Sequence, residues 1–267
     1  MPYLQIEPKV VLHYKEHGEG IPIIFLHGVW MSSEFFKKQI PYFSKKYKII
    51  TLDFRGHGKS SHPAYGHTIN QYAKDLQKFI ELKQLKNVVL VGWSMGAFVI
   101  WEYLKNKGEE NIKGTVIIDE MASDFKWADF PIGAFDFNTL ISFMRSVQTE
   151  RVEFLKGFIP LMFKNEISEE ELLWMLKETT AMSESIASAI LFDQSVVDYR
   201  KDIATFQNPC LLCFGKEEKL IPLAAGVQIK EAQKNATLEI FHNSCHCPFL
   251  EEPELFNKKV DDFISNL

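Results

Sequence analysis

Cysteine is scarce in this chain, with 4 Cys among 267 residues. So few thiols in a chain of this length do not indicate the disulfide framework that stabilises small secreted domains. Neither sign of charge is in large excess, because 30 Lys and Arg against 35 Asp and Glu leave a net charge of −5. A chain without a basic field is poorly suited to nucleic acid or to an anionic membrane surface. We therefore expect neither as a partner.

Long uncharged apolar runs are also missing. No stretch is long enough to cross a bilayer, and residues 1–7 show no basic segment followed by an apolar one. We therefore expect a protein without a signal peptide, located in the cytoplasm.

A complete phosphate-binding motif is absent from the loop at residues 53–60, although this loop ends in Gly-Lys-Ser. A Walker-type loop needs a glycine at position 53, where the chain has Asp53. The G-x-G-x-x-G pattern also fails, because Ser61 stands in place of its last glycine. We expect this loop to be structural rather than nucleotide-binding.

Alternation of strand-like and helix-like segments is the main pattern that the sequence does contain. Because the two kinds of segment alternate, we expect a mostly parallel eight-stranded sheet with helices on both faces. Helices are expected at about residues 33–40, 68–82, 97–107, 223–234 and 254–264. Strands are expected at residues 3–6, 9–14, 21–26, 47–52, 88–91, 115–118, 210–214 and 237–241.

From about residue 122 the alternation stops. We interpret residues 1–121 and 207–267 as one α/β core, and residues 122–206 as a helical lid inserted before the last two strands. Ligands of parallel sheets bind beyond the carboxyl ends of the strands, so a lid rich in aromatic residues would enclose an apolar pocket there. The helical patterns of this segment lie at residues 138–147, 151–163, 168–182 and 185–199, after an irregular aromatic stretch at 124–136.

The sequence Gly-Trp-Ser-Met-Gly at residues 92–96 is the motif on which the functional interpretation depends. It follows a predicted buried strand and precedes a predicted helix. So sharp a turn forces its middle residue into strained backbone angles, and the flanking glycines relieve the crowding. We expect the hydroxyl of Ser94 at the tip of the sheet beside a helix N-terminus, which suits a nucleophile.

A serine hydroxyl needs a base that takes its proton, and the base needs a carboxylate that orients it. His246 follows the last predicted strand and is our candidate base, with His242 as the local alternative. Glu218 follows the preceding strand and is our candidate acid. The alternatives for the acid are Glu217, Asp119 and Glu120.

The oxyanion that develops during acyl transfer needs backbone N–H donors. Met95 follows the nucleophile at the start of the predicted helix and offers one donor. Val29, in the loop after the strand at residues 21–26, offers the second. Trp30 and Trp93 adjoin Val29 and the nucleophile, and they are the candidate substrate contacts.

A zinc site is the competing interpretation of the cysteines. Cys210 and Cys213, with the Cys245-His246-Cys247 segment, superficially match zinc-ligand spacing. Residues three apart in a strand point to opposite faces, so Cys210 and Cys213 cannot readily share one ion. We expect no metal and no other cofactor.

Four landmarks of this sequence occur in the order in which the α/β-hydrolase family has them. They are His27-Gly28, the loop at 53–60, the motif at 92–96, and an acid followed by a late histidine. The chain resembles this family over nearly its whole length. Within the family it is similar to esterases related to cofactor-free haloperoxidases, some of which also make peracids.

The resemblance implies a role for each candidate residue. It makes Ser94 the nucleophile, His246 the base and Glu218 the acid, with Val29 and Met95 as oxyanion donors. The family usually has Asp where this chain has Glu218.

We therefore expect a serine hydrolase that cleaves a small, largely apolar carboxylic ester through an acyl-enzyme, with the small-molecule substrate as its partner. Two alternatives use the same residues. One is a ligand-binding signalling protein whose hydrolysis is slow or vestigial. The other is carbon–carbon bond hydrolysis or perhydrolysis at the same triad.

Overall fold

The computed structural model describes residues 3–267, which form one eight-stranded sheet of the order β1-β2-β4-β3-β5-β6-β7-β8. The pairs β1–β2 and β2–β4 are antiparallel and the other pairs are parallel, so the expectation of a mostly parallel sheet is confirmed. The strands are β1 (Tyr3–Glu7), β2 (Val10–His17), β3 (Pro22–Leu26), β4 (Lys48–Leu52), β5 (Val88–Trp93), β6 (Ile112–Ile118), β7 (Cys210–Gly215) and β8 (Ala236–Phe241).

The register of the central strands aligns their carboxyl ends. Leu26 at the end of β3 pairs with Gly92 of β5, and Trp93 of β5 pairs with Ile118 at the end of β6. The loops after these strands therefore begin at the same edge of the sheet, where ligands of such sheets bind.

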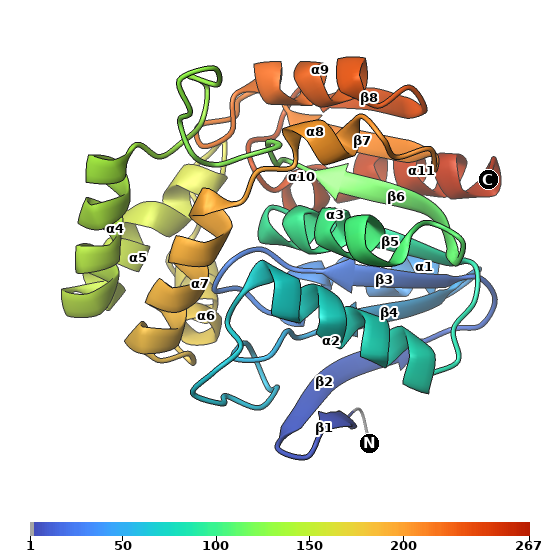
Figure 1. The fold of residues 1–267 in the computed structure, drawn as a ribbon, viewed down its shortest axis with the longest axis horizontal. Coiled ribbons are helices and arrows are strands. Elements are labelled where there is room, and N and C mark those ends of the chain that lie inside the picture. The colour runs from blue at the N-terminus through green and yellow to red at the C-terminus, as the bar shows by residue number, and fades with distance from the viewer. Residues whose placement is uncertain (1–2) are drawn as a thin grey trace.

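Helices cover both faces of the sheet (Figure 1). One face carries α2, α3 and α9, and the other carries α1, α10 and α11. Their bounds are α1 (Ile40–Phe43), α2 (Ile69–Leu82), α3 (Met95–Lys107), α9 (Leu223–Ala232), α10 (Pro248–Glu251) and α11 (Pro253–Ser265), with the short 3-10 helix η1 (Ser33–Phe36) before α1.

The segment between β6 and β7 is helical and contains no strand in the described chain. Figure 1 shows α4 to α7 grouped at the side toward which the parallel strands point. A helical cover over the carboxyl ends is the arrangement that a lid requires, and the boundaries of the lid remain a prediction. The elements are α4 (Phe137–Thr149), α5 (Arg151–Phe158), η2 (Ile159–Met162), α6 (Glu169–Thr179), α7 (Glu184–Val196) and α8 (Arg200–Ile203).

Two predicted helices are wrong in detail. The helix expected over residues 33–40 is split into η1 and α1, and Gln39 N donates to Phe36 O in the tight turn between them. The helix expected over residues 151–163 ends at Phe158 and continues as η2. Both later pieces, α1 and η2, have proline in their first turn, where its missing N–H costs nothing.

The loop at residues 53–60 is held by hydrogen bonds to the Asp53 carboxylate, from within the loop and from neighbouring segments. The buried carboxylate of Asp53 accepts from Ser33 N at 2.6 Å, Lys59 N at 3.0 Å and His13 Nδ1 at 2.8 Å. Burial by itself would raise the pKa of Asp53, but these donors and His27 lower it to about 2. The carboxylate occupies the space into which a side chain at Gly58 would project. This loop thereby packs beneath the segment that follows β3.

Candidate active site

Ser94 lies at a strained turn between β5 and α3. Its φ of 50° and ψ of −124° fall outside the regions that ordinary residues occupy. The turn is tight because α3 packs directly on the sheet: a Cβ at Gly96 would overlap the carbonyl oxygen of Leu26. At Gly92 a Cβ would lie 2.6 Å from the carbonyl carbon of Gly96. The glycines of the motif therefore permit the close approach that places Ser94 at the head of α3.

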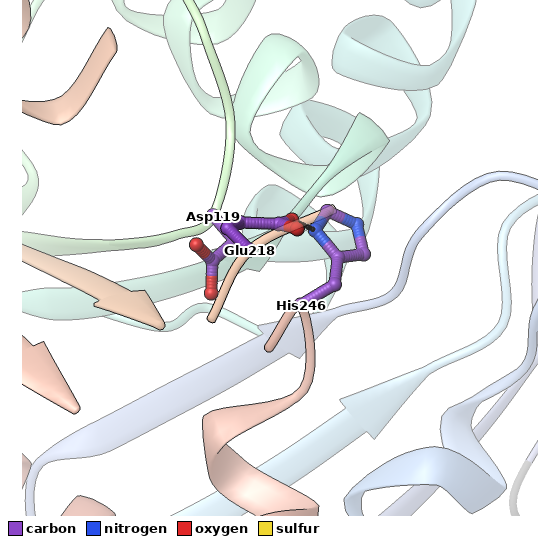
Figure 2. Close-up of side chains that lie close together, drawn as sticks. All are labelled: Asp119, Glu218 and His246. Carbon is purple, nitrogen blue, oxygen red and sulfur yellow. Dashed lines mark hydrogen bonds and ion pairs between the residues drawn. The ribbon is translucent and has the colours of Figure 1, made fainter. Parts of the chain in front are cut away.

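His246 lies in the loop between β8 and α10, and Glu218 lies in the loop after β7. The Nδ1 atom of His246 is 2.6 Å from Oε1 of Glu218 (Figure 2). The second carboxylate oxygen of Glu218 accepts from Leu220 N at 2.8 Å, and Cys245 Sγ lies 3.4 Å from it. Burial opposes ionisation of Glu218, but His246 and these donors hold its pKa below the usual value. Glu218 is therefore a buried carboxylate that stays charged beside the imidazole.

Trp93 ties the His246 loop to the turn that carries Ser94. Its indole Nε1 donates to the carbonyl oxygen of His246 at 2.9 Å, and its ring packs against Phe249 and Phe35. The side chain of Trp93 is buried and is not among the described residues that line the cavity beside Ser94. That Trp93 contacts substrate therefore stays a prediction, while the structure shows its ring packed under the site and its indole bonded to the histidine loop.

The alternative acids lie elsewhere around the site. Asp119 is fully buried and accepts from Gly215 N, and its carboxylate, that of Glu218 and the His246 ring lie within 4.8 Å of one another. Burial and the neighbouring Glu218 raise the pKa of Asp119 well above its ordinary value. Glu120 is buried and lines the same cavity as Ser94. Glu217 is half-exposed, and His242 is exposed.

The two proposed backbone donors lie at one end of the sheet. Met95 is the first residue of α3, and the N–H of a first helical residue has no partner within its helix. Val29 follows β3 in a loop that is held by the hydrogen bonds Met31 N to Gly28 O at 3.2 Å and Trp30 N to His57 Nε2 at 3.3 Å. A Cβ at Gly28 would lie 3.3 Å from the Cβ of Ser94, so this loop passes directly over the nucleophile turn.

A cavity of about 240 Å³ opens beside Ser94. Its apolar wall comes largely from the helical insertion. Trp30 is part of the lining, and its contact with substrate stays a prediction. The lining residues are Val29, Trp30, Ser94, Glu120, Asp124, Ala134, Phe135, Thr139, Phe143, Phe158, Leu191, Gln194, Lys219, Leu220, Ile221 and His246.

Solved structures of similar shape are named as a bromoperoxidase and as esterases. Residues 21–140 match the family model described as alpha/beta hydrolase fold. The bromoperoxidase from Bacillus anthracis superposes with a TM-score of 0.94 at 28% identity, covering 98% of this chain and 99% of that one. An esterase from Exiguobacterium antarcticum also gives 0.94, at 25% identity over 98% of each chain. A Burkholderia cenocepacia protein provisionally named an aryl esterase gives 0.84 at 30% identity, covering 96% of this chain and 94% of its own.

The chain belongs to the α/β-hydrolase family. The likeness to a bromoperoxidase and to esterases confirms the resemblance drawn from the sequence. Among residues 3–267 of this α/β hydrolase, no helix is long and apolar enough to span a membrane.

The cysteines of this hydrolase do not form a metal-ligand cluster within the described chain. Cys210, Cys213, Cys245 and Cys247 are free and buried. The group with metal-binding potential among residues 3–267 is instead Asp119, Glu218 and His246. The Nδ1 atom of His246 is already hydrogen-bonded to Glu218, which fits an oriented imidazole better than a metal centre.

Sequence reasoning missed part of the cavity. Asp124 and Gln194 line it, but they lie 70 residues apart and neither belongs to a motif. The only signal was the aromatic composition of residues 124–136, which includes Phe135. Composition shows that such a segment packs somewhere, and only the fold shows that it packs against the nucleophile.

Proposed function

We propose that this α/β hydrolase is a serine esterase that cleaves small, largely apolar carboxylic esters through an acyl-enzyme. The observation that carries the proposal is the 2.6 Å hydrogen bond between Glu218 and His246 Nδ1, beside a serine in a strained turn. A proton fixed on Nδ1 leaves Nε2 of His246 as the basic atom. Since Ser94 and His246 line one cavity, that atom can serve the serine hydroxyl.

In the proposed reaction, Ser94 Oγ attacks the ester carbonyl carbon while His246 takes the hydroxyl proton. The carbonyl oxygen becomes an oxyanion, which accepts from the N–H groups of Val29 and Met95. The carbon–oxygen bond to the alcohol then breaks, and His246 returns the proton to the departing alcohol. Water, deprotonated by His246, attacks the acyl-enzyme and releases the carboxylic acid and free Ser94.

The burial and charge of Glu218 support the role of His246 as the base. Glu218 stays ionised because its pKa is held below the usual value by His246 and its other donors, despite burial. A charged carboxylate at 2.6 Å stabilises the imidazolium that forms when His246 takes the serine proton.

The lining of the cavity supports an apolar substrate of modest size. Phe135, Phe143, Phe158 and Leu191 form a wall contributed by the segment between β6 and β7. A volume of about 240 Å³ lies just below the range of typical small-molecule sites, roughly 300–1,000 Å³. A short or aromatic acyl group fits this space better than a long chain.

Perhydrolysis is a second candidate, favoured by the likeness to a bromoperoxidase. In that reaction hydrogen peroxide replaces water in the second step: its oxygen attacks the acyl-enzyme and His246 takes its proton. Peracid and free Ser94 result, and no electron transfer is required. Adding peroxide to an esterase assay and measuring peracid tests this reaction directly.

The deciding experiment compares wild type with Ser94→Ala on p-nitrophenyl esters. We expect steady turnover by wild type, a loss of at least ~10³-fold in Ser94→Ala, and a stable mass increase on Ser94 after treatment with a fluorophosphonate. Turnover by Ser94→Ala near the wild-type rate would contradict the nucleophile assignment. Release of one product molecule per wild-type chain would favour a sensor over an enzyme.

A further inference from the structure

Three buried polar side chains meet in the cavity wall beside Ser94. Glu120 and Asp124 follow β6, and Gln194 lies on α7. Their exposed fractions are 1%, 3% and 4%, yet all three line the cavity. Buried polar groups are costly unless paired, so a polar corner in an otherwise apolar pocket needs an explanation.

Some of the polar atoms in this corner have hydrogen-bond partners within the protein. Gln194 Nε2 donates to Asp124 Oδ2 at 3.0 Å, and Met121 N donates to Glu120 Oε1 at 2.8 Å. The carboxyl groups of Glu120 and Asp124 also interact with each other. Burial raises the pKa of Glu120 well above its usual value and that of Asp124 to about 6, so the pair keeps a proton near neutral pH.

Two acceptor atoms of the corner are left over. Asp124 Oδ1 and Gln194 Oε1 receive no N–H or hydroxyl donor from the described residues 3–267. Both are oxygens, and both belong to side chains that line the cavity. A ligand that completes the corner must therefore supply donors rather than acceptors.

We infer that the corner formed by Glu120, Asp124 and Gln194 binds a hydrogen-bond-donating group, a hydroxyl or an amino group, that the substrate carries near its ester carbonyl. The position follows from the lining of the cavity: the corner shares its wall with Ser94, so a group held there lies in the same cavity as the carbon that Ser94 attacks. The inference rests on the proposed esterase function and narrows its substrate class.

The chemistry of the corner discriminates between substrate classes. A carboxylate or phosphate substituent would meet oxygen acceptors and the charge of the pair, and is rejected. A purely apolar acyl group would leave the two acceptors buried and unpaired. A hydroxyl or amino group satisfies them, while the remaining atoms of the acyl group contact Phe135 and Leu191.

The test uses three esters of the same size: ethyl hydrocinnamate, its β-hydroxy derivative and its β-amino derivative. We expect kcat/KM of wild type to be at least ~10-fold higher for one or both donor-bearing esters than for ethyl hydrocinnamate. Preference for the amino ester alone identifies an ammonium site, and preference for the hydroxy ester identifies a neutral donor site.

Variants test whether Gln194 and Asp124 cause the preference for donor-bearing esters. Gln194→Leu and Asp124→Asn should reduce the preference ratio to within about threefold of unity, because each removes or rearranges a free acceptor. The matched control is Gln148→Leu on α4, whose amide donates to Glu184 O at 2.8 Å and Ser188 Oγ at 2.7 Å outside this cavity. We expect the control to keep the wild-type ratio.

Binding measured without turnover separates this inference from the esterase proposal. Hydrocinnamamide and its β-hydroxy derivative are compared by thermal shift with Ser94→Ala, and the hydroxy amide should stabilise that protein more. Equal kcat/KM values for all three esters, or a preference that survives Gln194→Leu, overturn the inference and leave the esterase intact. Failure to hydrolyse any ester, with the amide preference retained, overturns the esterase and leaves the donor site.

Discussion

The indole nitrogen of Trp93 donates to the main-chain carbonyl of His246 at 2.9 Å, so the residue before the nucleophile holds the residue proposed as the base. The two rings also lie 5.7 Å apart. This bond joins the end of β5 to the loop after β8, elements that are not neighbours in the sheet. The position of the imidazole thus depends on a side chain that does not line the cavity.

Replacing Trp93 with Phe removes this donor and keeps an aromatic ring. We expect kcat to fall about tenfold, because a buried carbonyl left unpaired costs ~1–3 kcal/mol and the loop moves to recover a partner. The matched control is Trp101→Phe on α3, where the indole packs against Phe98 and Tyr199 away from His246. A lower melting temperature in both variants, with kcat reduced only in Trp93→Phe, supports a positioning role; equal kcat values contradict it.

Removing the charge of Glu218 should have the largest effect after loss of the nucleophile. Glu218→Gln leaves the size of the side chain unchanged but places an amide against His246 Nδ1, so we expect kcat to fall by ~10³–10⁴-fold, as in other triads. Asp119→Asn is the comparison, because burial and Glu218 raise the pKa of Asp119 and favour its neutral form. We expect Asp119→Asn to lose less than about tenfold. A greater loss in Asp119→Asn than in Glu218→Gln would move the acid to Asp119.

Sequence reasoning succeeded where a local pattern dictates a local structure. The apolar run before Ser94, the flanking glycines and the helix after them predict a turn whose backbone the structure shows to be strained. It also placed Glu218 after β7 and His246 after β8, because parallel strands deliver the loops at their carboxyl ends to one edge. Which acid faces the imidazole is a question of distance, and spacing in the chain cannot answer it.

The parts that could not be predicted depend on contacts between distant segments. Trp93 is predicted to contact substrate because it adjoins Ser94. Strand alternation turns its ring toward Phe35 and Phe249 under the site. The pair of Asp124 and Gln194 arises only when α7 packs over the residues that follow β6. No motif marks such a pair, because its two residues belong to segments that are distant in the sequence.

The close packing of α3 on the sheet gives a stability prediction. Gly96→Ala adds a Cβ that overlaps the carbonyl oxygen of Leu26, so backbone must move, and we expect a loss of at least ~2 kcal/mol in the free energy of unfolding together with loss of activity. Gly157→Ala in α5 is the matched control, because nothing lies within 4 Å of its added Cβ. That variant should be neutral or stabilised by up to ~1 kcal/mol, since alanine favours helix. Denaturant unfolding checks both, and equal stabilities would contradict the packing argument.

Removing metal ions with a chelator distinguishes a metal-independent hydrolase from a metal enzyme. Asp119, Glu218 and His246 have ligand atoms within 4.8 Å of one another, so metal binding at this group is a testable alternative. If His246 is an oriented base, dialysis against EDTA should leave kcat/KM for p-nitrophenyl esters unchanged, and added zinc should inhibit by binding the imidazole that acts as the base. Loss of activity on dialysis, with recovery on adding a divalent metal, would contradict the proposed mechanism.

The buried carboxyl of Asp124 should weaken the fold at neutral pH. Burial raises its pKa from 3.8 to about 6, although Glu120 and the Gln194 amide, which donates to Oδ2 at 3.0 Å, act to lower it. Well below pH 3.8 the Asp124 carboxyl is protonated in both the folded and the unfolded chain, so its ionisation does not lower the free energy of unfolding. As pH rises from there through about 6, the unfolded chain ionises first and stability falls, by ~3 kcal/mol in all for a pKa difference of this size.

Asp124→Asn removes that cost and keeps a side chain of the same size. We expect the variant to be more stable than wild type at pH 7 by ~1–3 kcal/mol, and the gain to vanish as pH falls through the range from about 6 toward 4. The matched control is Asp136→Asn, at the exposed N-cap of α4. Thr139 N donates to the Asp136 carboxylate at 2.8 Å and lowers its pKa, so no such gain is expected. Urea unfolding at several pH values measures both. A gain in Asp124→Asn that is independent of pH would show that ionisation of this carboxyl does not oppose folding.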